Sequence, residues 1–111
     1  CNELIGLATP ASVANLSTCA NMEDYNSFGP RSAAKAARGV QLARSIIATE
    51  LLCAAEGVEA HRPHRSGEPV EQAIKLIREV VPPLSEDRSP SPDIAAIEKL
   101  IEKDAFGPLL S

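Results

Sequence analysis

Aromatic residues are scarce in this chain of 111 residues, which has no Trp, one Tyr and two Phe. Any core must therefore be built from Ala, Leu, Ile and Val, and Ala in particular buries little area. Because burial contributes roughly 25 cal/mol per Å² of apolar surface, an Ala-rich helix is held weakly unless several partners surround it. We expect the chain to need packing partners, and to associate or to be partly disordered when it is isolated.

A basic excess, a long apolar run and a paired cysteine pattern are also missing. The chain has 11 basic and 15 acidic residues, a formal net charge of -4, which argues against general nucleic-acid binding. No apolar run approaches the roughly 18 uncharged residues of a membrane span, and no basic start precedes an apolar stretch as in a signal peptide. Cys1, Cys19 and Cys53 are widely and irregularly spaced. That spacing is typical of free thiols in a reducing compartment, so we expect a cytoplasmic location.

The pattern of apolar residues predicts an all-α protein without strands. Pro30 suits the first turn of a helix, where its missing N–H has no helical partner, and Gly57 suits the left-handed position that ends one. Ser91 is expected to cap a later helix. The predicted elements are an N-terminal irregular segment with a short helix near Asn2 to Ala8, one long helix over about 30–56, and two shorter helices over about 69–81 and 92–105.

Apolar residues cover more than one face of the predicted long helix, which indicates burial on more than one side. One set recurs at spacings of three and four: Ala33, Ala36, Val40, Ala43, Ile47, Leu51 and Ala54. A second set lies on another face: Leu42, Ile46 and Cys53.

Most candidate sites for chemistry are incomplete. His61 and His64 are three residues apart, but Pro63 lies between them and breaks a regular helix, and no nearby Cys or Asp completes the three or four ligands that zinc needs. We therefore predict no metal site. No cysteine is paired with a histidine by its spacing, so inert thiols are the default interpretation. The chain also lacks the glycine patterns that bind nucleotides.

A polar cluster before the long helix remains, in which Glu23 stands with Asn21, Asp24 and Asn26. Two carboxylates this close can have their pKa values driven apart if one is buried, as a general base requires. Asn, Asp and Ser are also the preferred helix-capping residues, so the same cluster can simply cap the long helix. Both interpretations remain open from these residues alone.

Several short motifs follow one another in register along the chain. They are Pro10-Ala11-Ser12-Val13, Ser17-Thr18-Cys19-Ala20-Asn21-Met22-Glu23-Asp24, Ser27-Phe28-Gly29, Glu50-Leu51-Leu52-Cys53-Ala54-Ala55-Glu56-Gly57, Glu86-Asp87-Arg88 and Pro92-Asp93-Ile94. Together they resemble the C-terminal part of the histidine ammonia-lyase family, one branch of the aromatic amino acid ammonia-lyases and aminomutases. The resemblance covers most of the chain.

The resemblance implies a helical homotetramer that removes ammonia from an aromatic amino acid. The electrophile of the family is a methylidene-imidazolone prosthetic group made from an internal Ala-Ser-Gly, which this sequence lacks. We therefore expect residues 1–111 to be a C-terminal segment that is inactive alone and needs the remainder of the parent enzyme. Its expected parts are an active-site-proximal loop region (1–29), a long bundle helix (30–57) and a helical tail (58–111).

By its position in the motif, Glu23 matches the active-site glutamate of the family, which lies beside the substrate side chain. Asn21 and Met22 are the flanking candidates for substrate binding. A carboxylate at Glu23 implies histidine as substrate, because relatives specific for phenylalanine and tyrosine usually carry Gln there.

The chain also departs from the family pattern. Met22 replaces Gln, Tyr25 replaces His and Phe28 replaces Met, while Asn26-Ser27 is similar to the phenylalanine-specific branch. A phenylalanine or tyrosine lyase, an aminomutase and a non-catalytic helical assembly module therefore stay as alternatives.

Overall fold

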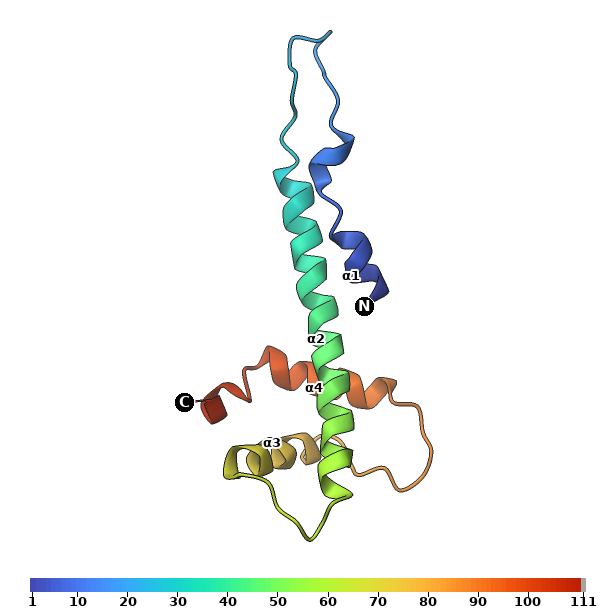
Figure 1. Ribbon diagram of the computed structural model, residues 1–111, viewed down its shortest axis with the longest axis vertical. Helices are drawn as coiled ribbons and strands as arrows, with labels where there is room; N and C mark the ends of the chain where they lie inside the picture. The colour runs from blue at the N-terminus through green and yellow to red at the C-terminus, as the bar shows by residue number, and fades with distance from the viewer. Residues whose placement is uncertain (111) are drawn as a thin grey trace. The chain divides into compact units, whose positions relative to one another are not determined.

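The computed structural model describes residues 1–110, and within them it is helical, without a regular strand. The all-α prediction is thereby confirmed. The elements in chain order are α1 (Asn2–Leu7), η1 (Ala11–Ala14), α2 (Gly29–Glu59), α3 (Glu68–Arg78), α4 (Ser91–Glu102) and η2 (Gly107–Leu110), the two η elements being 3-10 helices (Figure 1). No helix of the described residues is both long enough and apolar enough to cross a membrane.

The chain divides into two compact units, residues 1–43 and 44–111, with α2 running through the boundary.

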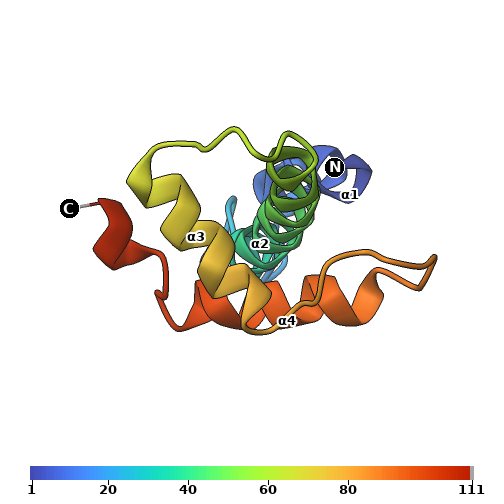
Figure 2. The same ribbon diagram turned by 90° about the horizontal axis from the view of Figure 1, so that it is seen from below.

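In the first unit, α1 lies beside the first half of α2 (Figures 1 and 2). Leu4 of α1 lies next to Gly39 of α2, where an added Cβ would be 3.7 Å from the Cδ2 atom of Leu4, an ordinary van der Waals contact. Arg38 binds both carboxylate oxygens of Glu3, at 2.8 and 3.1 Å. Both side chains are about half exposed, so this ion pair adds little stability. Lys35 donates to the backbone carbonyl of Thr9, which fixes the end of α1 against α2.

The second unit holds all the buried side chains of the described residues. They are Ala48 and Ala55 of α2, Ile74 and Ile77 of α3, Val81, and Ile97 of α4. Ala48 and Ala55 are seven residues apart, about two turns, and therefore share one face of α2. They share one core with the buried isoleucines of α3 and α4, the helices that cross near this half of α2 (Figure 2).

Neither of the two buried alanines belongs to the apolar sets that the sequence pattern singled out. Those sets include Val40 and Ile47, which are 61% and 47% exposed. The first set did include alanines, but the face of α2 that packs in the core lies one position further along the helix, at Ala48 and Ala55. Of the larger side chains of α2, Leu51, Leu52 and Val58 are partly buried against this core, whereas Val40 and Ile47 are exposed.

The prediction that the long helix ends at Gly57 is wrong. The helix continues to Glu59, and no glycine of residues 1–110 has a positive φ. The added turn is stabilised because Val58 packs against the core and Glu59 pairs with Arg78.

The shorter helices lie where they were predicted, with shifted ends. α3 ends at Arg78, although the N–H of Val81 still donates to the carbonyl of Ile77 at 2.9 Å, which continues the turn. α4 starts at Ser91 with Pro90 in the N-cap position, so Ser91 is not the cap that the sequence suggested. It ends at Glu102, before a turn in which Asp104 has a φ of 54°.

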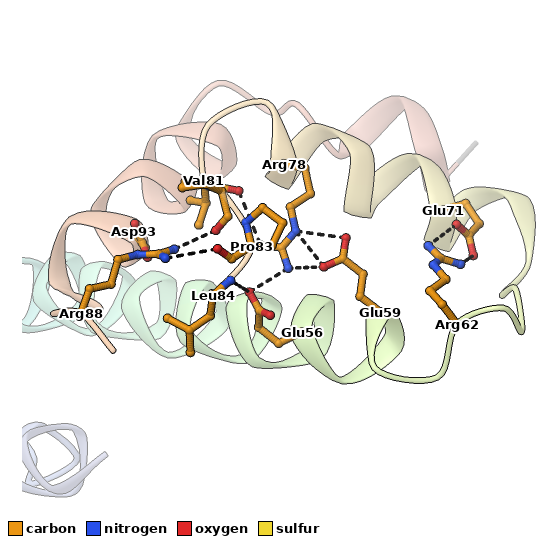
Figure 3. A network of polar contacts seen from close by, with 11 residues as sticks. Glu56, Glu59, Arg62, Glu71, Arg78, Val81, Pro83, Leu84, Arg88 and Asp93 are labelled. Atoms are coloured by element: carbon orange, nitrogen blue, oxygen red, sulfur yellow. Dashed lines mark hydrogen bonds and ion pairs between the residues drawn. The ribbon is translucent and has the colours of Figure 1, made fainter. Parts of the chain in front are cut away.

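A polar network ties the tail of the second unit to α2 (Figure 3). Arg78, in the last turn of α3, has a side chain only 13% exposed and pairs with Glu56 at 2.8 Å and with Glu59. Glu56 also accepts the N–H of Leu84 at 3.1 Å, which holds the segment after the two prolines. The hydrogen bond from Arg78 holds the pKa of Glu59 below its ordinary value.

Two further arginines close the loops on either side of α3 (Figure 3). Arg88 binds Asp93 of α4 at 2.9 Å and donates to the carbonyl of Pro82 at 2.7 Å. Arg62 binds both oxygens of Glu71 at 2.8 Å, and Glu71 also accepts the N–H of Ser66 at 2.9 Å. Each connector is thus fastened to the helix that follows it.

Replacing Gly57 by Ala should stabilise the chain. Gly57 lies inside α2 with a negative φ, and an added Cβ would meet no atom within 4 Å. Ala in a helix interior is favoured over Gly by about 0.5–1 kcal/mol, so the free energy of unfolding should rise by about that amount, seen as a higher urea midpoint at an unchanged slope. Gly67→Ala is the control, because Gly67 also has free space but stands at the N-cap of α3, where Ala brings no such gain. A lower midpoint for Gly57→Ala would mean that the helix ends there after all.

The pairing of Glu71 should make stability depend on pH in acid. The hydrogen bond from Arg62, followed by that from the Ser66 N–H, lowers the pKa of Glu71 from 4.5 to about 2. A lowered pKa in the folded state contributes stability that is present above the unfolded value and is lost as pH falls through the folded one. The melting-temperature advantage of the chain over its Glu71→Gln variant should therefore shrink as pH falls from about 5 to about 2. The control is Glu79→Gln, which removes an exposed carboxylate; equal shrinkage in both variants would contradict the assignment.

Candidate functional site

The segment between η1 and α2 folds back on itself around Thr18 and Glu23. The N–H of Thr18 donates to the carbonyl of Glu23 at 3.0 Å, and the N–H of Glu23 donates to the carbonyl of Thr18 at 3.3 Å. Between them, the N–H of Met22 donates to the carbonyl of Cys19 at 3.1 Å and closes a tight turn. The two ends of the polar motif thus face each other across a short backbone bridge.

Three consecutive residues of this turn have a positive φ although none is glycine. The values are 53° at Cys19, 54° at Ala20 and 68° at Asn21. Asn tolerates this region, whereas for Cys and Ala it costs roughly 1–2 kcal/mol each. Positive φ at both central residues is the geometry of a type I′ turn. The Thr18–Glu23 bridge holds the chain in this conformation, so the backbone rather than burial determines where Glu23 lies.

The Glu23 carboxylate is exposed in this chain and is held by a hydroxyl. The Oγ1 atom of Thr18 donates to its Oε2 atom at 3.2 Å. The same hydroxyl also lies 3.3 Å from the Oδ1 atom of Asn26. The side-chain partner of Glu23 is therefore Thr18 and not the neighbouring carboxylate of Asp24, as a tuned carboxylate pair would require.

Asn26 and Asn15 hold the loop that carries this contact. The side-chain N–H of Asn26 donates to the carbonyl of Leu16 at 2.6 Å. Asn15 binds the backbone of Asn26 twice, through its Oδ1 atom at 3.1 Å and its Nδ2 atom at 2.9 Å. Asn15, Thr18 and Asn26 are all partly buried. They form an internal framework for the loop, on whose surface Glu23 lies.

The other two predicted site residues lie on the same turn but do not bind Glu23. Asn21 accepts a hydrogen bond from the Ser17 hydroxyl at 2.7 Å. Met22 is 86% exposed. The structure therefore brings Asn21, Met22 and Glu23 together by chain proximity, and it leaves the Met22 side chain available for contact with another molecule or segment.

The polar cluster does not cap the long helix, which was the alternative interpretation. The side-chain hydrogen bond at the first residue of α2 comes from Ser27, whose Oγ atom accepts the N–H of Gly29 at 3.4 Å. The hydrogen bonds of Asn26 run to residues 15, 16 and 18 instead. The cluster organises the loop itself.

The histidines and two of the three cysteines lie apart from this loop in the sequence, whereas Cys19 is part of its turn. The Nδ1 atom of His61 is 2.8 Å from the carbonyl of Gly57, one turn back along the chain. Among residues 1–110, no group of three or more His, Cys, Asp or Glu side chains is arranged to hold a metal ion. Cys1, Cys19 and Cys53 are all free and exposed.

Sequence reasoning missed the parts of the site that depend on the fold-back. Thr18 and Asn15 carry no chemical signal of their own, and their roles appear only once the chain reverses. A left-handed turn is usually signalled by glycine, which is absent here, so Asn21 is the only residue of the turn whose type favours that conformation.

Comparison with known proteins defines the class. A family model described as aromatic amino acid lyase matches residues 1–79. The chain belongs to the aromatic amino acid lyase family.

Its relatives within this class share one name. The chain is 41% identical over 95 residues to a histidine ammonia-lyase of Natranaerobius thermophilus, covering 86% of this chain and 19% of that protein. It is 42% identical over 104 residues to one of Rhodospirillum rubrum, covering 94% and 20%. The crystal structure of histidine ammonia-lyase from Trypanosoma cruzi superposes with a TM-score of 0.90 at 40% identity, over 97% of this chain and 21% of that chain. The chain thus spans about a fifth of the length of these relatives.

Proposed function

We propose that this chain is the C-terminal part of an enzyme that eliminates ammonia from histidine to give urocanate. The observation that carries the proposal is the similarity to histidine ammonia-lyases along almost the whole chain, at about 40% identity and with the same backbone arrangement. The similarity includes the loop that holds Glu23. A reducing, cytoplasmic setting is part of the proposal, and the three free cysteines support it.

Glu23 has the chemistry to recognise an imidazole ring. An ionised carboxylate is an acceptor only, and the imidazole of histidine presents an N–H that such an oxygen can bind. Thr18 donates to Oε2, and among residues 1–110 no side chain donates to Oε1. We assign Glu23 as the active-site carboxylate beside the substrate side chain, with Asn21 and Met22 as flanking contacts.

The prosthetic group of the family does not fit this chain by itself. It is formed from Ala-Ser-Gly, and the nearest triplets here are Ala11-Ser12-Val13 and Arg65-Ser66-Gly67. A methylidene-imidazolone would have to come from another part of the parent enzyme, and the residues of this chain bind and orient the substrate.

The exposed apolar surface of the chain supports the proposal that it packs against the rest of such an enzyme. Large apolar side chains are exposed in both units, among them Ile5, Val13, Leu16, Tyr25 and Val40. The second unit also has an apolar hollow of about 490 Å³, lined by residues that include Leu51, Val70 and Phe106. Exposed apolar area of this kind is usually covered by another chain or segment. We propose the remainder of the parent enzyme, assembled as a homotetramer, as that cover.

The structure gives the phenylalanine branch little additional support. Its sequence signal is Asn26-Ser27, and Asn26 has a role inside the loop, where it binds Leu16 and Thr18. Such a role is independent of the substrate ring. Glu23 therefore remains the residue that favours histidine.

Replacing Glu23 by Gln in the complete enzyme should lower kcat/KM for histidine by about 100-fold, because a hydrogen bond to a charged acceptor is lost at the substrate ring. Steady-state formation of urocanate, followed by its ultraviolet absorbance, measures this. Asp24→Asn removes the adjacent carboxylate as a matched control and should stay within about threefold of the parent. Unchanged histidine kinetics in Glu23→Gln would refute the assigned role.

The isolated 111-residue chain should release no ammonia from histidine, phenylalanine or tyrosine, because it cannot form the electrophile. A coupled ammonia assay at high chain concentration tests this. Ammonia release that grows with chain concentration and survives repurification would contradict it.

A further inference from the structure

We propose that Thr18 is a positioning residue that orients the Glu23 carboxylate toward the substrate ring. This inference rests on the function proposed above, because it assigns Thr18 a role that acts only through Glu23. Neither residue type nor spacing points to Thr18; the contact arises from the fold-back of the loop.

The hydroxyl of Thr18 lies between two acceptors. Oε2 of Glu23 is 3.2 Å away and Oδ1 of Asn26 is 3.3 Å away. A hydroxyl has one proton, and an ionised carboxylate is a stronger acceptor than an amide oxygen. The proton therefore goes to Glu23, and the amide oxygen of Asn26 bounds the other side of the hydroxyl.

Asn26 cannot take over as donor to Thr18 by flipping its amide. Its Nδ2 atom donates to the carbonyl of Leu16 at 2.6 Å, so a flip would place two oxygens against each other. Asn15 holds the backbone of Asn26 on both its N–H and its carbonyl. Asn15 and Asn26 thus hold an acceptor on one side of the Thr18 hydroxyl, and the charged acceptor on its other side is Glu23.

The backbone bridge brings Thr18 and Glu23 into register. Their two mutual hydrogen bonds close the strained turn of Cys19, Ala20 and Asn21, where φ is positive at all three positions. Strain of this kind persists only where surrounding contacts over-determine it, and it gathers at functional sites. Here it places a hydroxyl directly opposite the carboxylate.

In this arrangement the Oε2 atom of Glu23 is bound by Thr18, and the Oε1 atom is open to the substrate. Thr18 restrains the side-chain rotation of Glu23, so less rotamer freedom is lost when a ring N–H binds to Oε1. A phenyl ring has no N–H and gains nothing from this arrangement. Thr18 therefore contributes to selectivity for an imidazole.

The test uses variants of the complete enzyme assayed with histidine. Thr18→Val keeps the shape of the side chain and removes the hydroxyl, and it should lower kcat/KM by about tenfold, the factor expected for one hydrogen bond to a charged group. Thr18→Ser restores the hydroxyl and should return kcat/KM to within about threefold of the parent. If Thr18→Val does not fold, Thr18→Cys gives the same comparison with a weak donor in place of the hydroxyl.

A double-mutant cycle separates positioning from a structural role. In the Glu23→Gln background, Thr18→Val should have little further effect, because the group it orients has changed. Ser27→Ala is the matched control: it removes a hydroxyl of the same loop that binds the start of α2, and its effect should be independent of Glu23.

The outcomes are distinct. Unchanged kinetics in Thr18→Val, or an equal loss in both backgrounds, overturns the positioning role while leaving the function of Glu23 intact. Failure of Thr18→Ser to recover activity overturns it as well. If Glu23→Gln itself leaves histidine turnover unchanged, the proposed role of Glu23 fails first, and the role of Thr18 fails with it.

Discussion

Close contact at Ala48 and Ala55 is the constraint on which the second unit depends. These are the two fully buried residues of α2, and the core of this unit is built around them by isoleucines of α3 and α4 and by Val81. A larger side chain at either alanine would push the helices apart, and helix packing distances follow the side chains at the contact. One aromatic side chain, Phe106, packs at the edge of this core and is only partly buried.

Charged side chains extend that contact to segments that the apolar core does not reach. Arg78 and Arg88 are both partly buried, and each binds a carboxylate as well as a backbone carbonyl. A guanidinium has five N–H donors in a fixed plane, so one side chain can satisfy several acceptors of an irregular segment. The Pro82-Pro83 segment, which cannot donate hydrogen bonds from its proline nitrogens, is held in this way between α3 and α4.

The helices could be predicted from the sequence, whereas the core and the loop could not be predicted in detail. Proline positions and apolar spacing located α2, α3 and α4 within a few residues, because they report local backbone preferences. The end of α2 was misplaced because Val58 and Glu59 are held by tertiary contacts, which override the tendency of Gly57 to end a helix. Ala48 and Ala55 were overlooked because apolar residues cover several faces of α2, and the positions of α3 and α4 determine which of these faces is buried. Glu23 was predicted as a site residue through a motif. The contact of the Thr18 hydroxyl with it depends on a reversal of the chain, and no glycine in the turn indicates that reversal.

The left-handed turn at Cys19, Ala20 and Asn21 has a consequence for how the loop tolerates change. Glycine adopts this backbone conformation freely, so a glycine at Cys19 or Ala20 would relieve the strain, and yet it would also widen the set of conformations open to the loop. Residues with a Cβ raise the energy of this turn, and they also reduce the number of alternative backbone conformations of the loop. The loop is therefore strained but restricted to few conformations. The position of the Glu23 carboxylate is defined by this backbone although the side chain is exposed.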